Sequence, residues 1–231
     1  MDSRLFDKRG YPVVGAAKGY GEWAATYDET VAAGLDRPLL ERVRSVNWPA
    51  VRNAADLACG TGRTGRWLKD NGVARVEGVD ITPEMLALAA RRGAHDALHV
   101  ADVAATPLPS SAYDLCTLVL ADEHLTDLGP VYREAWRLLE AGGRFLLIGY
   151  HPFFIMNGTP THFHRPGGEA ITVETHVHLF ADHFRAGCNV GLTLIEAEEC
   201  VVDEAWLVSK PKWRKHLGWP VSFAWVWRKG R

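Results

Sequence analysis

Three glycines crowd a short segment near residue 60, and this segment constrains the fold more than any other feature of the chain. It reads Asp56-Leu-Ala-Cys-Gly60-Thr-Gly62-Arg-Thr-Gly65 and continues an apolar run that is typical of a buried strand. Because glycine has no side chain to clash, the backbone can turn sharply into a helix and come close to a ligand. We therefore expect a strand, a tight turn and a helix whose N–H groups face a bound small molecule.

Strand-like and helical segments alternate around this turn. Such alternation predicts an α/β fold with a doubly wound, Rossmann-like parallel sheet covered by helices. A helix at 181–186 and strand-like runs at 192–202 and 221–228 predict a closing antiparallel strand pair. The expected elements before them are strand 53–58, helix 63–69, strand 75–80, helix 83–91, strand 97–101, strand 113–120, helix 128–139 and strand 144–150. Gly142-Gly143 would end the helix at 128–139.

The whole chain is expected to form one domain, because 231 residues suit a single well-buried α/β unit. Apolar residues at helical spacing predict two helices between Gly21 and Val46, separated at Pro38, that could cover a ligand as a lid. The expected parts are a flexible arm (1–18), lid helices (19–50), a cofactor-binding core (51–150), a hairpin inserted after the fifth strand (151–180), and a C-terminal helix and strands (181–231).

Charge and composition exclude several classes of partner. The chain has 26 Lys and Arg residues against 28 Asp and Glu, so no overall field draws it to nucleic acid or to an anionic membrane. The N-terminus lacks an apolar signal core, and no window holds eighteen uninterrupted apolar residues. The four cysteines are scattered, as is usual for reduced thiols. Together these features predict a cytoplasmic protein without a membrane segment. One basic cluster is interpreted as a solvated face rather than a nucleic-acid contact: Lys210, Lys212, Arg214 and Lys215.

The glycine spacing alone fits two classes of cofactor. Gly60-x-Gly62-x-x-Gly65 satisfies the dinucleotide fingerprint, and Asp80 at the end of the second strand could bind ribose hydroxyls in either class. Asp56, four residues before Gly60, would repel a pyrophosphate but favour a cationic sulfonium with its ammonium group. The two leading helices and the closing antiparallel strands also depart from a nicotinamide-binding domain. The sequence therefore favours S-adenosyl-L-methionine, with a nicotinamide-dependent dehydrogenase as the alternative.

A series of motifs between residues 20 and 150 resembles the class I S-adenosylmethionine-dependent methyltransferase family, especially its small-molecule branch. The resemblance implies a seven-stranded sheet with the last strand antiparallel. One departure, Leu139-Glu-Ala-Gly-Gly where Lys-Pro-Gly-Gly is usual, affects a turn and not the site. The motifs are Tyr20-Gly-Glu-Trp-Ala-Ala-Thr-Tyr27-Asp28, Asp56-Leu-Ala-Cys-Gly-Thr-Gly62, Val76-Glu-Gly-Val-Asp80-Ile-Thr-Pro-Glu-Met85-Leu, Ala101-Asp102-Val103 with Pro107-Leu-Pro, Tyr113-Asp114, and Tyr132-Arg-Glu-Ala-Trp-Arg-Leu-Leu-Glu-Ala-Gly-Gly143.

The resemblance also implies which residues hold the cofactor. Gly60 and Gly62 would approach its methionine portion, and Asp80 would bind both ribose hydroxyls. The other positions that it assigns to the cofactor are Tyr20, Tyr27 over the methionine end, Asp56, Ile81, Met85, Asp102 and Val103 at the adenine, and Leu120 beneath the sulfonium.

The reaction implied is methyl transfer to a small-molecule acceptor whose nucleophilic atom, O, N or C, stays open. Such a displacement mainly requires alignment of the acceptor and exclusion of water, and a base only for hydroxyl or carbon acceptors. His124 and His151 follow the fourth and fifth strands at the carboxyl edge and are the catalytic candidates. The structural alternatives are a packing histidine and a loop residue. A module that binds the cofactor or a partner protein without turnover is the remaining functional alternative.

Histidines and tryptophans near the C-terminal half allow further interpretations. A strand at 162–164 and a possible partner strand at 176–178 could in principle bring His162, His164, His176 and His178, with His183 beyond, around a metal. No carboxylate or cysteine completes a ligand set, so we expect no metal and interpret the inserted hairpin as a wall facing the acceptor. The aromatic residues are interpreted as strand packing rather than as the lining of an acceptor cavity: Trp206, Trp213, Trp219, Phe223, Trp225 and Trp227.

Overall fold

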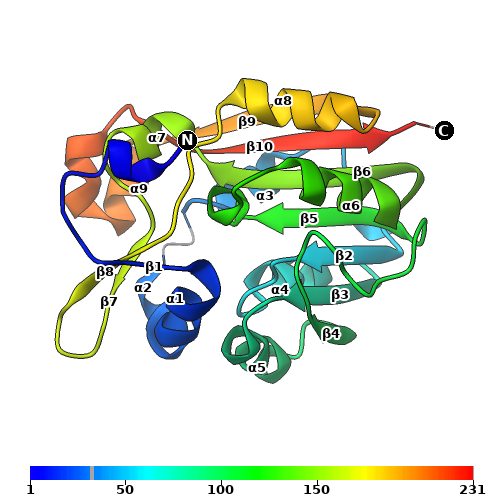
Figure 1. Cartoon of the computed structure of the whole chain (residues 1–231). Helices are drawn as coiled ribbons and strands as arrows, with labels where there is room; N and C mark the ends of the chain where they lie inside the picture. The colour runs from blue at the N-terminus through cyan, green and yellow to red at the C-terminus, as the bar shows by residue number, and fades with distance from the viewer. Residues whose placement is uncertain (32–33, 231) are drawn as a thin grey trace.

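The fold is taken from a computed structural model that describes residues 1–31 and 34–230 (Figure 1). Residues 32–33, which fall within the expected lid, and Arg231 lie outside the described residues. A seven-stranded sheet crosses the molecule in the order β4-β3-β2-β5-β6-β10-β9. Its strands are β2 (Asn53–Leu57), β3 (Arg75–Asp80), β4 (Ala97–Val100), β5 (Tyr113–Val119), β6 (Leu139–Tyr150), β9 (Leu192–Val201) and β10 (Pro220–Lys229).

The direction of the strands confirms the predicted topology. Strands β4, β3, β2, β5 and β6 pair in parallel, whereas β10 runs antiparallel to both β6 and β9. Strand β10 is buried along nearly its whole length, as expected for a strand that is covered on both faces. The closing hairpin expected from the C-terminal sequence is therefore the pair formed by β9 and β10.

Helices cover both faces of this sheet and create two hydrophobic cores. Leu146 and Ile148 of β6 point into the core beneath α3 and α4, whereas Phe145 and Leu147 point into the core beneath α6 and α8. Figure 1 shows α6 and α8 on the near face of the sheet. The helices of the core are α3 (Arg37–Arg42), α4 (Arg63–Asp70), α5 (Pro83–Arg92), α6 (Gly129–Leu138) and α8 (Phe180–Asn189).

The glycine pair at Gly142-Gly143 has a different role from the one predicted. Helix α6 ends at Leu138, and β6 already begins at Leu139, so the pair lies inside the strand. Gly142 has a φ of +80°, and the pairing with β5 shifts register nearby. The glycines therefore form an irregularity at the start of β6 rather than a helix end.

The N-terminal segment is not a free arm in this structure. The amino group of Met1 donates to the carbonyl of Val177 at 2.7 Å, and Val13 pairs with Thr172 in a parallel strand ladder. This pairing satisfies backbone groups at a sheet edge far away in the sequence, which no local periodicity could reveal. The elements of this region are η1 (Ser3–Leu5), β1 (Val13–Val14), α1 (Ala16–Trp23), η2 (Ala24–Thr26), α2 (Tyr27–Thr30) and, before the core, η3 (Trp48–Ala50).

The lid is made of several short helices rather than two longer ones. Pro38 lies in the first turn of α3 and does not separate two helices, because proline fits a helix start without losing a hydrogen bond. Helices α1 and α2 lie at the lower left of Figure 1, beside the inserted hairpin. None of the helices within residues 1–31 and 34–230 is long and apolar enough to cross a lipid bilayer.

The inserted hairpin forms a separate three-stranded sheet in the order β1-β8-β7. Its antiparallel strands are β7 (His162–His164) and β8 (Ala170–Val173), so the partner of His162–His164 is not the run 176–178. Phe163 and Val173 pack against Trp23 of α1, which attaches the hairpin to the lid. The remaining elements around it are α7 (Pro152–Met156), α9 (Glu204–Ser209) and η5 (Pro211–His216).

Candidate functional site

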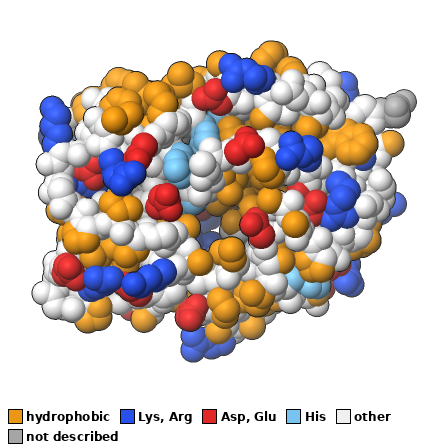
Figure 2. Space-filling model, in the orientation of Figure 1, with side chains coloured by type: hydrophobic (Ala, Val, Ile, Leu, Met, Phe, Trp, Pro, Cys, Tyr) orange, Lys and Arg blue, Asp and Glu red, His pale blue; other side chains and the backbone are white. Residues whose placement is uncertain are grey.

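A cavity of about 250 Å³ opens at the carboxyl ends of β2, β3 and β5, where α1 and α2 face the sheet. Figure 2 shows a hollow near the middle of this face of the molecule. Ligands of open α/β sheets bind at this edge. The residues predicted from sequence that line the cavity are Tyr20, Tyr27, Gly60, Asp80, Ile81, Met85, Asp102, Val103, Leu120 and His124.

A second cavity of about 330 Å³ lies at the opposite edge of the sheet and contains none of the predicted residues. Arg52 lines it and makes ion pairs with Asp114 at 3.1 Å and Glu140 at 2.8 Å. These charged groups already neutralise one another, and the glycine turn at Gly60 does not line this cavity. We therefore take the cavity at the carboxyl edge as the site.

The glycine turn holds the carboxylate of Asp80 at the mouth of the cavity. The backbone N–H of Gly60 donates to Asp80 Oδ2 at 2.8 Å, and the N–H of Thr82 donates to Oδ1 at 2.8 Å. Gly60 has a φ of +52°, and the space where a side chain would stand is open. Burial raises the pKa of Asp80, while these two backbone donors oppose that effect. The anchored carboxylate retains lone pairs that can accept hydroxyl groups of a ligand.

Asp56 and Gly62 are placed behind the turn and do not line the cavity. Asp56 Oδ1 accepts from the Thr117 hydroxyl at 2.8 Å, and Oδ2 lies 3.0 Å from His95 Nε2. A side chain at Gly65 would come within 2.3 Å of the same nitrogen. The glycines therefore make room for His95 as well as for a ligand. Sequence reasoning missed His95, because a lone histidine between a helix and a strand carries no pattern.

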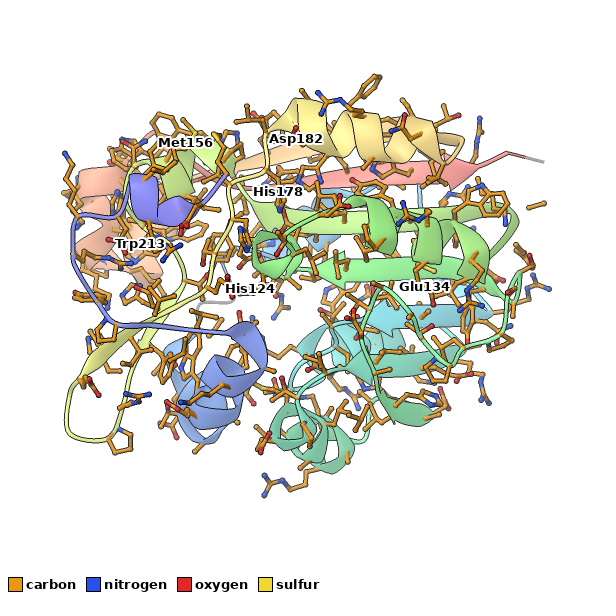
Figure 3. The ribbon with its side chains drawn as sticks, viewed as in Figure 1. His124, Glu134, Met156, His178, Asp182 and Trp213 are labelled. Atoms are coloured by element: carbon orange, nitrogen blue, oxygen red, sulfur yellow. The ribbon has the colours of Figure 1, made fainter. Side chains whose placement is uncertain are left out.

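His124 lines the cavity from a short turn, η4 (Asp122–His124), that follows β5. Its Nδ1 is 2.6 Å from the carbonyl of Glu174, which can only accept, so Nδ1 carries the proton. The other nitrogen, Nε2, is then an acceptor for the Tyr20 hydroxyl at 2.8 Å. Burial lowers the pKa of His124 to about 4, so the ring is neutral at neutral pH. Figure 3 shows His124 between the sheet and the hairpin side of the molecule.

Glu123, beside His124, is a functional candidate that sequence reasoning missed. Its side chain is 1 % exposed and its Oε1 accepts from the Thr161 hydroxyl at 3.2 Å. Apart from the Asp122 carboxyl beside it, no group within residues 1–31 and 34–230 makes a hydrogen bond to its Oε2. Oε1 also lies 3.5 Å from His124 Nε2. Burial, reinforced by the Asp122 carboxylate, raises the pKa of Glu123 well above its usual value. The available signal was an acidic pair directly after an apolar strand, where carboxylates are costly to bury.

His151 is separated from the cavity. Its Nδ1 accepts from the N–H of Phe153 at 3.2 Å and so caps α7, and its Nε2 lies 3.4 Å from Glu199 Oε1. The ring packs edge-on against Phe180 at 4.9 Å. Burial lowers the pKa of His151. The structure thus brings His124, but not His151, to the residues that line the cavity.

Two ion pairs, which we call the lid–turn contacts, join the lid to the glycine turn and its neighbouring helices. Asp28 of α2 accepts from the Thr61 hydroxyl at 2.8 Å and from Arg92, and Arg92 Nε donates to the Thr61 carbonyl at 2.7 Å. Asp36 and Arg63 approach to 3.3 Å on the other side of the turn. The lid therefore closes the cavity through charge as well as through apolar packing.

The histidines of the hairpin do not gather around a point. His162 and His164 have ring centres 6.1 Å apart, and His162 lies against Arg9 at 3.0 Å. His178 is occupied elsewhere, because its Nε2 donates to the Leu125 carbonyl at 2.6 Å. Among residues 1–31 and 34–230, no group of three or more His, Cys, Asp or Glu side chains is arranged to hold a metal ion.

The C-terminal aromatic residues pack the core. Trp227 is fully buried on β10 and lies edge-on to Tyr132 with ring centres 5.8 Å apart. Trp213 of η5 stacks on Phe154 at 5.6 Å. None of these rings is among the residues that line the cavity at the carboxyl edge. Packing is therefore the role that their contacts support.

The sequence matches a known family over its central part. The profile of the family described as "Methyltransferase domain" matches residues 55–147, which begin within β2, contain the glycine turn and end within β6. The match thus covers the strands whose carboxyl ends form the cavity, and it omits the lid and the hairpin.

Two curated relatives are named as methyltransferases. A demethylmenaquinone methyltransferase of Thermus thermophilus is 34 % identical over 108 residues, which are 45 % of this chain and 49 % of the relative. A malonyl-[acyl-carrier protein] O-methyltransferase of Serratia marcescens is 32 % identical over 132 residues, which are 56 % of this chain and 50 % of the relative. The chain thus spans about half the length of the curated relatives it matches.

A solved structure shares the fold over a larger part of the chain than the family profile matches. The S-adenosylmethionine dependent methyltransferase from Mesorhizobium loti superposes with a TM-score of 0.62 at 22 % identity, covering 93 % of this chain and all of the other. At this identity the likeness concerns the fold. Residues 55–147 are thus similar to the methyltransferase domain family, and the chain shares the α/β fold of a solved S-adenosylmethionine dependent methyltransferase, as the motifs predicted.

Proposed function

We propose that this protein transfers the methyl group of S-adenosylmethionine to a small-molecule acceptor. The observation that carries this proposal is the position of Asp80, which two backbone N–H groups fix at the mouth of a cavity at the carboxyl edge of the sheet. The family match and the names of the relatives, which concern a quinone and a malonyl carrier protein, support the same class of reaction. We also propose that the chain acts as a single domain.

The residues around the cavity fit this cofactor. The Asp80 carboxylate suits the two ribose hydroxyls, and the apolar side chains of Ile81 and Val103 suit an adenine ring. The rings of Tyr20 and Tyr27 line the lid side, where they would favour a sulfonium cation by cation–π attraction. Asp56 would act only through its field, because its oxygens already bond to groups behind the turn.

When bound, the cofactor supplies a methyl carbon that is already activated by the sulfonium. The protein must then hold an acceptor in line and keep water away. Tyr20 and His124 stand at the acceptor end, and the lid–turn contacts hold α2 over the site. We assign the acceptor side to His124 rather than to His151, because only His124 lines the cavity.

Calorimetric titration tests the cofactor assignment. We expect saturable binding of S-adenosylmethionine and of its demethylated product, and no binding of NAD(H). Binding of NAD(H) with no binding of the two sulfur ligands would overturn the proposal in favour of a dehydrogenase.

A panel of hydroxyl, amine, thiol and carbon acid acceptors with labelled methyl donor tests turnover. We expect label in at least one small-molecule product. If the cofactor binds but no acceptor is labelled, the chain is a cofactor-binding module without turnover.

A further inference from the structure

The carboxyl group of Glu123 is placed behind the acceptor end of the cavity without a cation to balance it. Its Oε1 lies 3.5 Å from Nε2 of His124, and that same nitrogen accepts the Tyr20 hydroxyl at 2.8 Å. Both His124 and Tyr20 line the cavity, whereas Glu123 does not. A chain of close contacts therefore leads from the cavity wall to a buried acid that lies beside the Asp122 carboxyl.

The groups that face Glu123 come from several elements. The hairpin segment supplies the Thr161 hydroxyl and the backbone N–H of His176, which bonds to the Glu123 carbonyl. Within the described residues no Lys or Arg side chain makes an ion pair with Glu123, and Arg63, across the lid, is engaged by Asp36. The titratable side chains around it are Tyr20 of α1, Tyr27 of α2, Tyr150 of β6, and Asp122 and His124 of η4.

Within residues 1–31 and 34–230, the carboxyl group of Glu123 has the Asp122 carboxyl beside it and no Lys or Arg partner, which favours its neutral form. Burial raises the pKa of Glu123 because water no longer solvates the charged form, and the Asp122 carboxylate disfavours a second negative charge. A cation placed in the adjoining cavity reverses this preference, because opposite charges attract strongly where water is excluded. The methyl donor carries such a cation on its sulfur, and its demethylated product does not.

We propose that Glu123 changes its protonation with the charge of the bound cofactor: it is a carboxylate while the sulfonium occupies the cavity and a carboxylic acid when the cavity is empty or holds the neutral product. This proposal rests on the proposed function. It makes Glu123 a positioning residue that acts through His124 and Tyr20 and receives the proton released by the acceptor.

The proposal defines the class of acceptor and balances the reaction. A hydroxyl group loses its proton as its oxygen forms the bond to the methyl carbon, and the methyl–sulfur bond breaks with both electrons remaining on sulfur. Tyr20 takes that proton while passing its own to His124 Nε2, which passes it to Glu123. The positive charge of the donor and the negative charge of Glu123 thus disappear together, and the products are an ether or ester, a thioether and a carboxylic acid. The acceptor in this scheme is a neutral group that releases one proton on methylation, for which a hydroxyl group is the case written here.

His124 alone could not hold this proton near neutral pH. Burial lowers the pKa of His124 to about 4, and its Nδ1 is committed to the Glu174 carbonyl. Glu123 is shifted in the opposite direction. Of the two side chains, Glu123 is therefore the better site for the proton after the methyl group has moved.

Proton exchange on binding tests this inference without turnover. Calorimetric titration at pH 6.5 in buffers of different ionisation enthalpy gives the number of protons exchanged for S-adenosylmethionine and for its demethylated product. We expect proton release with S-adenosylmethionine and none with the product. The amino group shared by both ligands is protonated at this pH, since its ordinary pKa is about 8, so it contributes little to the difference.

Two variants make the assignment specific. Glu123→Gln should abolish the difference in proton release, whereas Glu134→Gln should retain it. Glu134 is also a buried carboxylate, but it pairs with Arg137 at 2.6 Å on α6, and Figure 3 shows it well away from His124. In wild type, the ratio of the affinity for S-adenosylmethionine to the affinity for the product should increase with pH. The total increase should be about tenfold for each unit by which the sulfonium lowers the pKa of Glu123.

Equal proton counts for the two ligands in wild type would overturn the inference, and this measurement stands even if Glu123→Gln does not fold. Unchanged release in a folded Glu123→Gln variant would equally overturn it. Both results leave the cofactor assignment intact, because both require the ligands to bind. If neither ligand binds, the proposed function fails, and the inference fails with it.

Discussion

Asp56 and His95 form a buried pair directly behind the glycine turn, with Asp56 Oδ2 3.0 Å from His95 Nε2 and both side chains almost inaccessible to solvent. The ring lies against the backbone of the turn, where a side chain at Gly65 would collide with it. The shape of the turn therefore depends on a residue thirty positions away as well as on its own glycines.

Gly65→Ala should destabilise the protein by about 1–3 kcal/mol, because overpacking forces a shift of a ring that Asp56 holds in place. This loss would be opposite in sign to the intrinsic preference of a helix for alanine over glycine, which is about 1 kcal/mol. Urea denaturation measures the change in free energy of unfolding. Gly230→Ala is the matched control, because its new methyl group would meet nothing within 4 Å. Equal stability of the two variants would show that His95 can move aside freely.

Asp80→Ala should weaken binding of S-adenosylmethionine by about 1–3 kcal/mol, because the ribose hydroxyls lose a charged acceptor. Calorimetric titration gives this difference directly. Asp80→Asn should lose less, since it retains one acceptor oxygen of similar position. An unchanged dissociation constant for Asp80→Ala would place the ribose elsewhere in the cavity.

Asp28→Asn should weaken cofactor binding about two- to fivefold and mainly speed dissociation, because a partly exposed ion pair contributes about 0.2–1 kcal/mol. Stopped-flow displacement measures the dissociation rate. The matched control is Asp70→Asn, which removes an exposed ion pair with Arg66 on α4. If both variants release the cofactor at the wild-type rate, the lid–turn contacts do not restrain opening.

The free energy of unfolding should fall as the pH decreases from 6.5 to about 4, because the unfolded chain binds a proton on His124 in this range before the folded chain does. The pKa of His124 is lowered to about 4 by burial in the folded chain, against an ordinary value of 6.5, so the unfolded chain binds the proton first. This difference in pKa lowers the free energy of unfolding by about 3 kcal/mol between pH 6.5 and pH 4. His124→Gln, which cannot titrate, should show a shallower loss of unfolding free energy over that interval. Parallel pH profiles for wild type and variant would contradict this assignment.

The sequence predicted those features that depend on short stretches of chain. Local periodicity and motifs predicted the succession of strands and helices around Gly60, the antiparallel end of the sheet, and the position of Asp80 and Asp102 at one edge. They were predictable because the carboxyl ends of parallel strands must meet.

The features that escaped prediction depend on contacts between distant segments. The start of the chain docks on β8 through backbone pairing, which leaves no side-chain signature. His95 and Glu123 acquire their surroundings from elements far away in sequence, so their importance is invisible in the residues beside them. Pro38 shows the same limit, because a proline that interrupts a period can equally begin a helix.

The pairing of β1 with β8 also limits which segments can be exchanged between proteins of this fold. One edge of the sheet β1-β8-β7 comes from the beginning of the chain and the other two strands from its second half, so the sheet is not encoded by one continuous segment. Swapping the hairpin alone between two such proteins would leave β1 against a foreign edge with unmatched side chains. This sheet should therefore change more readily by point substitution than by recombination, unless both segments are transferred together.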